Sequence, residues 1–138
     1  MEKNQKVTHG GCLCGATRFM ATGVELGAGY CHCTSCRRHS GAPVVAFVVF
    51  EETQVKWLEA ERSRYQSSPG KFRSFCGTCG ASLAFEDYSG DVPLIEFYIS
   101  ALDNPEAFPP NEHTHFAERI SWFCPSDELT KYKGSMRE

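Results

Sequence analysis

The sequence contains no long hydrophobic run and no large excess of charge of one sign. Its longest apolar stretch, 42–50, has nine residues, whereas a membrane-spanning helix needs about 20. Lysine and arginine number 14 against 17 aspartate and glutamate residues, which leaves a net charge of -3. We therefore expect no membrane segment and no nucleic-acid partner, because binding to phosphates requires clustered positive charge.

Several common functional motifs are also missing. The sequence has no phosphate-binding loop, no dinucleotide fingerprint and no Ser/His/Asp arrangement. It shows no internal repeat, linker or low-complexity tract, and 138 residues suit one domain, 1–138. The first ten residues are polar and lack the apolar stretch of a signal peptide. These features predict a cytoplasmic protein with reduced thiols.

Short β-rich runs between glycine and proline residues predict a mainly β fold with short helical turns. We expect strands at 16–21, 43–50, 54–58, 71–75, 81–85 and 94–99, and a tight turn at 67–70. The nearly continuous apolar run at 43–50 is typical of a strand covered on both faces. Helical signals are weak: we expect one helix at 34–40, between Thr34 as N-cap and Gly41, and another at 127–132, capped by Ser126.

Eight cysteines are the unusual feature of the composition. Seven precede residue 80, in the segments Cys12-x-Cys14, Cys31-x-Cys33-x-x-Cys36 and Cys76-x-x-Cys79, and Cys124 stands alone. Thiols of a reduced compartment more often bind metal than form disulfides. Structural zinc stabilises a small domain by about 10–16 kcal/mol, against about 2–4 kcal/mol for a disulfide. The pattern therefore predicts zinc, with an oxidised or merely buried set as the alternative.

Seven clustered cysteines divide into a set of four and a set of three. Four cysteines close a structural zinc site, whereas three protein ligands leave a position open for catalysis. One partition joins Cys12, Cys14, Cys76 and Cys79, and leaves Cys31, Cys33 and Cys36 for the open site. Spacing alone also permits Cys12, Cys14, Cys31 and Cys33 as the four, with Cys36, Cys76 and Cys79 as the three.

At these cysteines the sequence resembles the glutathione-dependent formaldehyde-activating enzyme family, which shares its domain with centromere protein V. The specific matching segments are 11–16 (GCLCGA), 31–37 (CHCTSCR) and 75–80 (FCGTCG). Ser40-Gly41 also matches, and weaker matches are 102–105 (LDNP) and His113 with Trp122. The chain departs from the family pattern at Thr114 and Ser121, and Cys124 has no counterpart in it.

The resemblance implies a zinc-stabilised β fold of the Mss4-like type, named after a small Rab-binding exchange factor. It also implies two zinc sites: a structural one held by Cys12, Cys14, Cys76 and Cys79, and a catalytic one held by Cys31, Cys33 and Cys36. The activity that it implies is a carbon–sulfur lyase reaction joining glutathione to formaldehyde as S-hydroxymethylglutathione. The partners would then be a small thiol and an aldehyde. A non-catalytic zinc-stabilised binding module is the alternative.

Four further residues are candidates for a role at the open site. Arg37 and Arg38 follow Cys36, where positive charge suits an anionic ligand, unless they form a solvated helix face. His113 or His115 could serve as a proton shuttle or fourth ligand, or be ordinary strand-edge histidines. We expect Arg37 and His113 to contact the cofactor. His32 should point away from its cysteine neighbours, and Cys124 should be a small buried hydrophobic residue.

Overall fold

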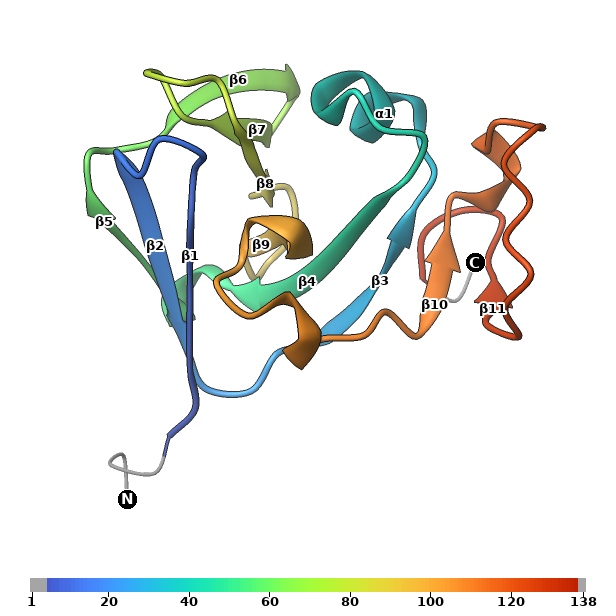
Figure 1. Ribbon diagram of the computed structural model, residues 1–138, viewed down its shortest axis with the longest axis horizontal. Coiled ribbons are helices and arrows are strands. Elements are labelled where there is room, and N and C mark those ends of the chain that lie inside the picture. Colours follow the sequence, from blue (N-terminus) through green and yellow to red (C-terminus); the bar gives the residue numbers. More distant parts are fainter. Residues whose placement is uncertain (1–4, 137–138) are drawn as a thin grey trace.

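The computed structural model describes residues 5–136, and most of its regular structure is β-sheet (Figure 1). Its strands are β1 (Val7–Gly11), β2 (Thr17–Thr22), β3 (Gly27–Cys31), β4 (Val45–Glu51), β5 (Val55–Glu59), β6 (Ser63–Ser68), β7 (Lys71–Phe75), β8 (Ser82–Asp87), β9 (Leu94–Tyr98), β10 (Glu112–Thr114) and β11 (Thr130–Lys131). Its helical segments are α1 (Thr34–Ser40) and the short 3₁₀ turns η2 (Glu52–Gln54), η3 (Ile99–Ala101), η4 (Pro105–Ala107) and η5 (Phe116–Glu118). None of these helices has the length and apolar character needed to traverse a bilayer. The predicted mainly β fold is confirmed.

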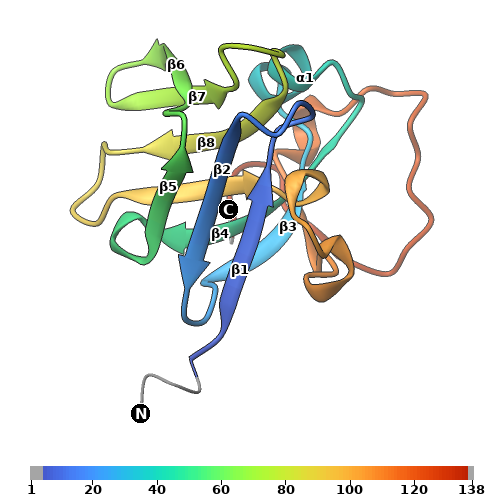
Figure 2. The same ribbon diagram turned by 60° about the vertical axis from the view of Figure 1, so that its left-hand side comes forward.

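The strands form two sheets of unequal size. One sheet has three strands in the order β1-β2-β5, and the other has eight in the order β11-β10-β3-β4-β9-β8-β7-β6. All neighbours are antiparallel except β10, which pairs in parallel with β3 and β11. Figure 2 shows the small sheet crossing over the strands of the large one. The large sheet therefore has one face against the small sheet and another free to carry a site.

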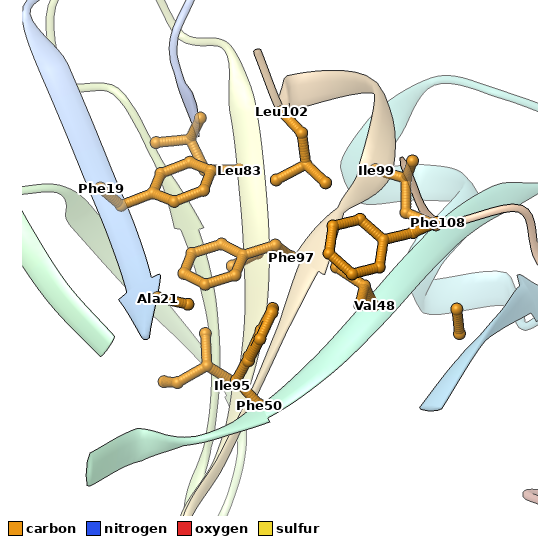
Figure 3. Packing of buried hydrophobic residues seen from close by; sticks show 12 residues of the cluster. Phe19, Ala21, Val48, Phe50, Leu83, Ile95, Phe97, Ile99, Leu102 and Phe108 are labelled. Carbon is orange, nitrogen blue, oxygen red and sulfur yellow. The ribbon is translucent and has the colours of Figure 1, made fainter. Parts of the chain in front are cut away.

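Aromatic and aliphatic side chains fill the space between the two sheets (Figure 3). Phe19 of β2 stacks on Phe97 of β9, with ring centroids 4.0 Å apart and an angle of 6° between the planes. Trp57 of β5 contacts both rings, each at a centroid distance of 5.6 Å. Since large aromatic rings contribute most of the buried apolar area in such cores, this group joins the sheets.

Strand β4 is buried on both faces, as the apolar run at 43–50 predicted. Val48 and Phe50 point into the core between the sheets, whereas Phe47 and Val49 pack on the opposite face. The cluster on that opposite face also contains Cys31, Cys36, Val45 and Tyr98. The alternation of side chains along one strand thus links the hydrophobic core to a cysteine-bearing face.

The six strands and the helix at 34–40 predicted from the sequence coincide with observed elements, with boundary shifts of at most two residues. The turn at 67–70 is also present, and Gly70 adopts a φ of 74° there. The unpredicted strands are β1, β3, β6, β10 and β11. They are two to six residues long, and glycine or serine is frequent in β1, β3 and β6. Such segments have low intrinsic β-propensity, so pairing with neighbours decides their conformation.

Two local predictions are wrong. No helix forms at 127–132: the Asp127 carboxylate accepts the backbone N–H of Leu129 at 3.1 Å, and residues 130–131 pair with β10 instead. A side chain that bonds its own following backbone competes with helix formation. At α1 the N-cap is Cys33 rather than Thr34, because the Cys33 sulfur accepts the N–H of Cys36 at 3.2 Å.

A buried ionic cluster joins β6, β7 and β8. The Glu86 carboxylate of β8 is fully buried and accepts hydrogen bonds from Arg62 at 2.9 and 2.8 Å and from Tyr88 at 2.8 Å. The Ser74 hydroxyl and Arg64 also donate to it. Burial opposes ionisation, but the hydrogen bonds from Arg62, Ser74 and Tyr88 outweigh it and hold the pKa of Glu86 below its usual value. The cluster therefore holds the β6–β7 hairpin against the sheet.

Replacing this carboxylate tests the role of the cluster. Glu86→Gln should lower the free energy of unfolding by about 3–5 kcal/mol, because it leaves the partly buried Arg62 guanidinium without its buried anion. Urea denaturation at pH 7 measures this loss. The matched control is Glu52→Gln on the exposed turn η2, which should change stability by less than about 0.5 kcal/mol. Equal stabilities of the two variants would contradict the assignment.

Candidate metal centre

Four cysteines from two distant turns converge into one group. Cys12 and Cys14 lie in the turn between β1 and β2, and Cys76 and Cys79 lie in the turn between β7 and β8. All four sulfur atoms lie within 4.8 Å of one another, with Cys12 and Cys14 3.7 Å apart and Cys14 and Cys76 3.9 Å apart. We call this group the cysteine quartet.

Backbone amides surround the sulfur atoms of the quartet. The N–H of Thr17 donates to the Cys12 sulfur at 3.2 Å, and the N–H groups of Thr78 and Cys79 donate to the Cys76 sulfur at 3.3 and 3.4 Å. Hydrogen bonds from Thr17 and from the amides of Cys79 and Thr78 lower the pKa of Cys76 to about 5. The turn geometry therefore favours a thiolate, which is the form that binds metal.

The other three clustered cysteines form a second group, the cysteine trio. Cys31 ends β3, Cys33 caps α1 and Cys36 lies in its first turn, and their sulfur atoms also lie within 4.8 Å of one another. Within residues 5–136 no fourth histidine, cysteine, aspartate or glutamate joins this group. Hydrogen bonds from Cys31 and Cys36 hold the pKa of Cys33 well below its usual value, which favours its thiolate form.

A buried arginine lies against the trio from the neighbouring part of the sheet. Nη1 of Arg73 on β7 donates to the sulfur of Cys36 at 3.2 Å, and the Arg73 side chain also lies over the ring of Phe85 at 4.3 Å. A guanidinium in this position offsets part of the negative charge that three sulfur ligands bring together. Strand β7 therefore contributes a positive charge beside the trio.

The trio opens onto a cavity of about 350 Å³. Its floor is the outer face of the large sheet, and α1, the β6–β7 turn and the segment after β10 form its walls. The lining residues that bear on its chemistry are Lys71, Arg73, Phe85, Glu96, His115 and Glu118. A larger hollow of about 750 Å³ lies beside Cys12 of the quartet, but none of the trio residues lines it. The smaller cavity is the one that borders three thiols.

Behind the trio, two histidines and an aspartate form a hydrogen-bonded chain. Nε2 of His32 lies 2.8 Å from Nδ1 of His113, and Nε2 of His113 lies 3.0 Å from Asp127 Oδ2. Both histidines are buried, and burial lowers the pKa of His32 to about 4. A carboxylate only accepts, so Nε2 of His113 donates to Asp127, and a neutral His113 accepts from His32. This chain of hydrogen bonds positions His32, which lies between Cys31 and Cys33 of the trio.

The other sequence-predicted candidates lie around the site in different ways. Arg37 donates to the carbonyl oxygens of His32 at 3.3 Å and Glu118 at 3.1 Å, and it is not among the residues lining the cavity. His113 does not line the cavity either, whereas His115 does. Arg38 is exposed. The structure thus places Arg37 and His113 as supports of the trio segment, and their contact with a cofactor stays a prediction.

The structure corrects the prediction for Cys124 and adds three residues that were not predicted. Cys124 is exposed, so the expectation of a buried hydrophobic residue is wrong. Arg73, Glu96 and Asp127 are the residues that sequence reasoning missed. A lone glutamate within the apolar strand 94–98 and an arginine between the phenylalanines of 71–75 were available signals. Asp127 had none, because only the folded chain places it beside His113.

All eight cysteines are free thiols, and seven of them lie in the two groups. Fold and site together define a mainly β protein with two cysteine groups that could hold metal ions. The sequence model of the glutathione-dependent formaldehyde-activating enzyme family matches residues 7–118. The chain belongs to this family.

Comparison with solved structures supports the same fold. A structural-genomics crystal structure of a Rhodobacter sphaeroides protein superposes with a TM-score of 0.56 at 18% sequence identity. The match covers 90% of this chain and 98% of the other. A search of curated proteins found no significant match.

The buried histidine chain can be tested by stability. His113→Ala should lower the free energy of unfolding by about 1–3 kcal/mol, because it leaves Nε2 of His32 buried without a partner. The control is His115→Asn, since residue 115 has a φ of 52°, which asparagine tolerates. The control should cost less than about 0.5 kcal/mol in urea unfolding. A smaller loss for His113→Ala than for His115→Asn would rule out the structural role of the chain.

Proposed function

We propose that this protein is a zinc-dependent carbon–sulfur lyase that joins a small thiol, glutathione by preference, to formaldehyde or a related aldehyde. The observation that carries the proposal is the difference between the two cysteine groups. The quartet has four ligands, whereas the trio has three and borders a cavity of about 350 Å³. Four protein ligands are typical of structural zinc, and three with an open position are typical of catalytic zinc. Membership of the family supports the choice of thiol and aldehyde.

The spacing of the sulfur atoms fits zinc. Tetrahedral coordination with Zn–S bonds of about 2.3 Å requires sulfurs roughly 3.8 Å apart. The sulfur distances of 3.7 and 3.9 Å in the quartet agree with this value, and those of the trio stay within 4.8 Å. A zinc ion held by the trio would supply its Lewis acidity, which keeps a bound substrate thiol deprotonated at neutral pH.

The residues of the chain supply binding and charge. Lys71 and Arg73 border the cavity from β7, so a substrate that carries carboxylates would meet two cations there. Ser35 on α1 and Ser67 at the end of β6 add hydroxyl groups to the walls. The volume lies at the lower end of the 300–1,000 Å³ that is usual for small-molecule sites, which suits a short peptide-like thiol better than a macromolecule.

The two cysteine groups should respond differently to substitution. Cys33→Ser should lose one of two bound zinc ions while the protein stays folded, because the trio is an open site on the outer face of the sheet. Cys76→Ser should unfold the protein or reduce its stability strongly, because a structural zinc stabilises by about 10–16 kcal/mol. Zinc content and circular dichroism of both variants measure the difference.

The unmodified protein and Cys124→Ser serve as controls, since the exposed Cys124 belongs to neither group. Cys124→Ser should keep two zinc ions and the full circular dichroism signal. Equal unfolding of Cys33→Ser and Cys76→Ser would contradict the division into structural and catalytic sites.

Binding of a thiol at the trio distinguishes the proposed enzyme from a non-catalytic binding module. Titrating glutathione into the cobalt-substituted protein should change the thiolate-to-cobalt absorption, because the substrate sulfur enters the open position. S-methylglutathione is the control, since it keeps the shape but has no thiol to ionise. A spectrum that glutathione leaves unchanged would favour a non-catalytic zinc-stabilised module.

A further inference from the structure

Glu96 is a carboxylate on the face of the large sheet that carries the cysteine trio. It lies on β9 between Ile95 and Phe97, whose side chains point into the core, so its own side chain points to the opposite face. Its cross-strand neighbours are Val49 on β4 and Phe85 on β8. Glu96 and Phe85 both line the cavity of the cysteine trio. The carboxylate thus stands on the floor of that cavity.

The Glu96 carboxylate has no hydrogen bond and no ion pair with any residue in 5–136. Glu86, on the neighbouring strand, has the opposite environment, since four different side chains donate to it. A partly buried carboxylate without a partner costs free energy, and native proteins keep such groups mainly where a ligand or a reaction uses them. The contrast indicates that Glu96 serves the cavity rather than the fold.

The charged groups facing Glu96 come from three parts of the chain. Lys71 and Arg73 on β7 favour its ionised form, whereas Asp87 on β8 and Cys33 of the trio oppose ionisation. His115 and Glu118 also line the cavity. Burial is the largest influence and raises the pKa of Glu96 to about 7. The group is therefore present in both protonation states at neutral pH, as efficient acid–base catalysis requires.

We propose that Glu96 is the proton-transfer residue of the trio cavity, accepting the proton of the substrate thiol and returning it to the aldehyde oxygen. This rests on the proposed function. The S–H bond breaks as its proton passes to the Glu96 carboxylate, and the sulfur electron pair forms the new S–C bond. The C=O π pair moves to oxygen, which takes the proton from the Glu96 carboxyl group. The carboxylate is regenerated, and no oxidant or reductant is needed.

The Glu96→Gln variant keeps the shape of the side chain and removes its proton chemistry. In the zinc-loaded protein, the accelerated formation of S-hydroxymethylglutathione from glutathione and formaldehyde should fall at least about 100-fold in kcat, with KM nearly unchanged. The acidic limb of the pH profile near 7 should also disappear. Glu52→Gln on the exposed turn η2 is the matched control and should keep full activity and the same pH profile.

Two readouts do not depend on activity. Infrared difference spectra of the unmodified protein should show a carboxyl C=O band titrating near pH 7, and Glu96→Gln should lack it. A raised carboxyl pKa in the folded state means that stability falls as pH rises from about 4.5 through 7. Glu96→Gln should therefore raise the urea midpoint at pH 8 and leave it unchanged at pH 4. A group needed for the fold would give a lower midpoint instead.

The outcomes separate the two proposals. An active unmodified protein together with a fully active Glu96→Gln variant would overturn the role of Glu96 and leave the proposed function standing. The absence of any carboxyl titration between pH 6 and 8 would overturn the Glu96 proposal on its own. An unmodified protein that fails to accelerate the reaction would overturn both.

Discussion

The sulfur atoms of Cys14 and Cys76 lie 3.9 Å apart although 62 positions separate them in the chain. Thiolates this close would repel each other, so an ionised quartet would need compensating positive charge from the surrounding backbone amides and from a bound cation. The same convergence joins the β1–β2 turn to the β7–β8 turn and so ties the small sheet to the large one. The convergence of the four sulfur atoms therefore governs both the charge balance of the quartet and the contact between the two sheets.

The trio shows a different use of the same residue type. Its three cysteines come from 31–36, a short segment around the start of α1, so little tertiary structure is needed to bring them together. The surrounding fold decides what they can do. The guanidinium of Arg73 contacts one sulfur, and the outer face of the sheet supplies an enclosed volume beside them. A metal held there would face a cavity with cations at one side and Glu96 on its floor.

The part of the chain after the family match contributes to the site. The family model ends at residue 118, and Asp127 lies beyond it, yet Asp127 anchors the chain that runs through His113 to His32. The strand pairing of β10 with β3 and β11 places these three residues together. This arrangement shows how a segment outside the matched residues 7–118 can hold the trio segment in position.

The sequence by itself determined the mainly β fold, six strands, the helix α1 and the division of seven cysteines into four and three, because these depend on local alternation, spacing and residue type. It left two partitions of the cysteines open, and only the tertiary structure gathers Cys12 and Cys14 with Cys76 and Cys79. Tertiary structure likewise decided the short strands, the turn at Asp127, and the placement of Arg73 and Glu96 at one cavity. Each depends on contacts between residues far apart in the chain, for which local propensity carries no information.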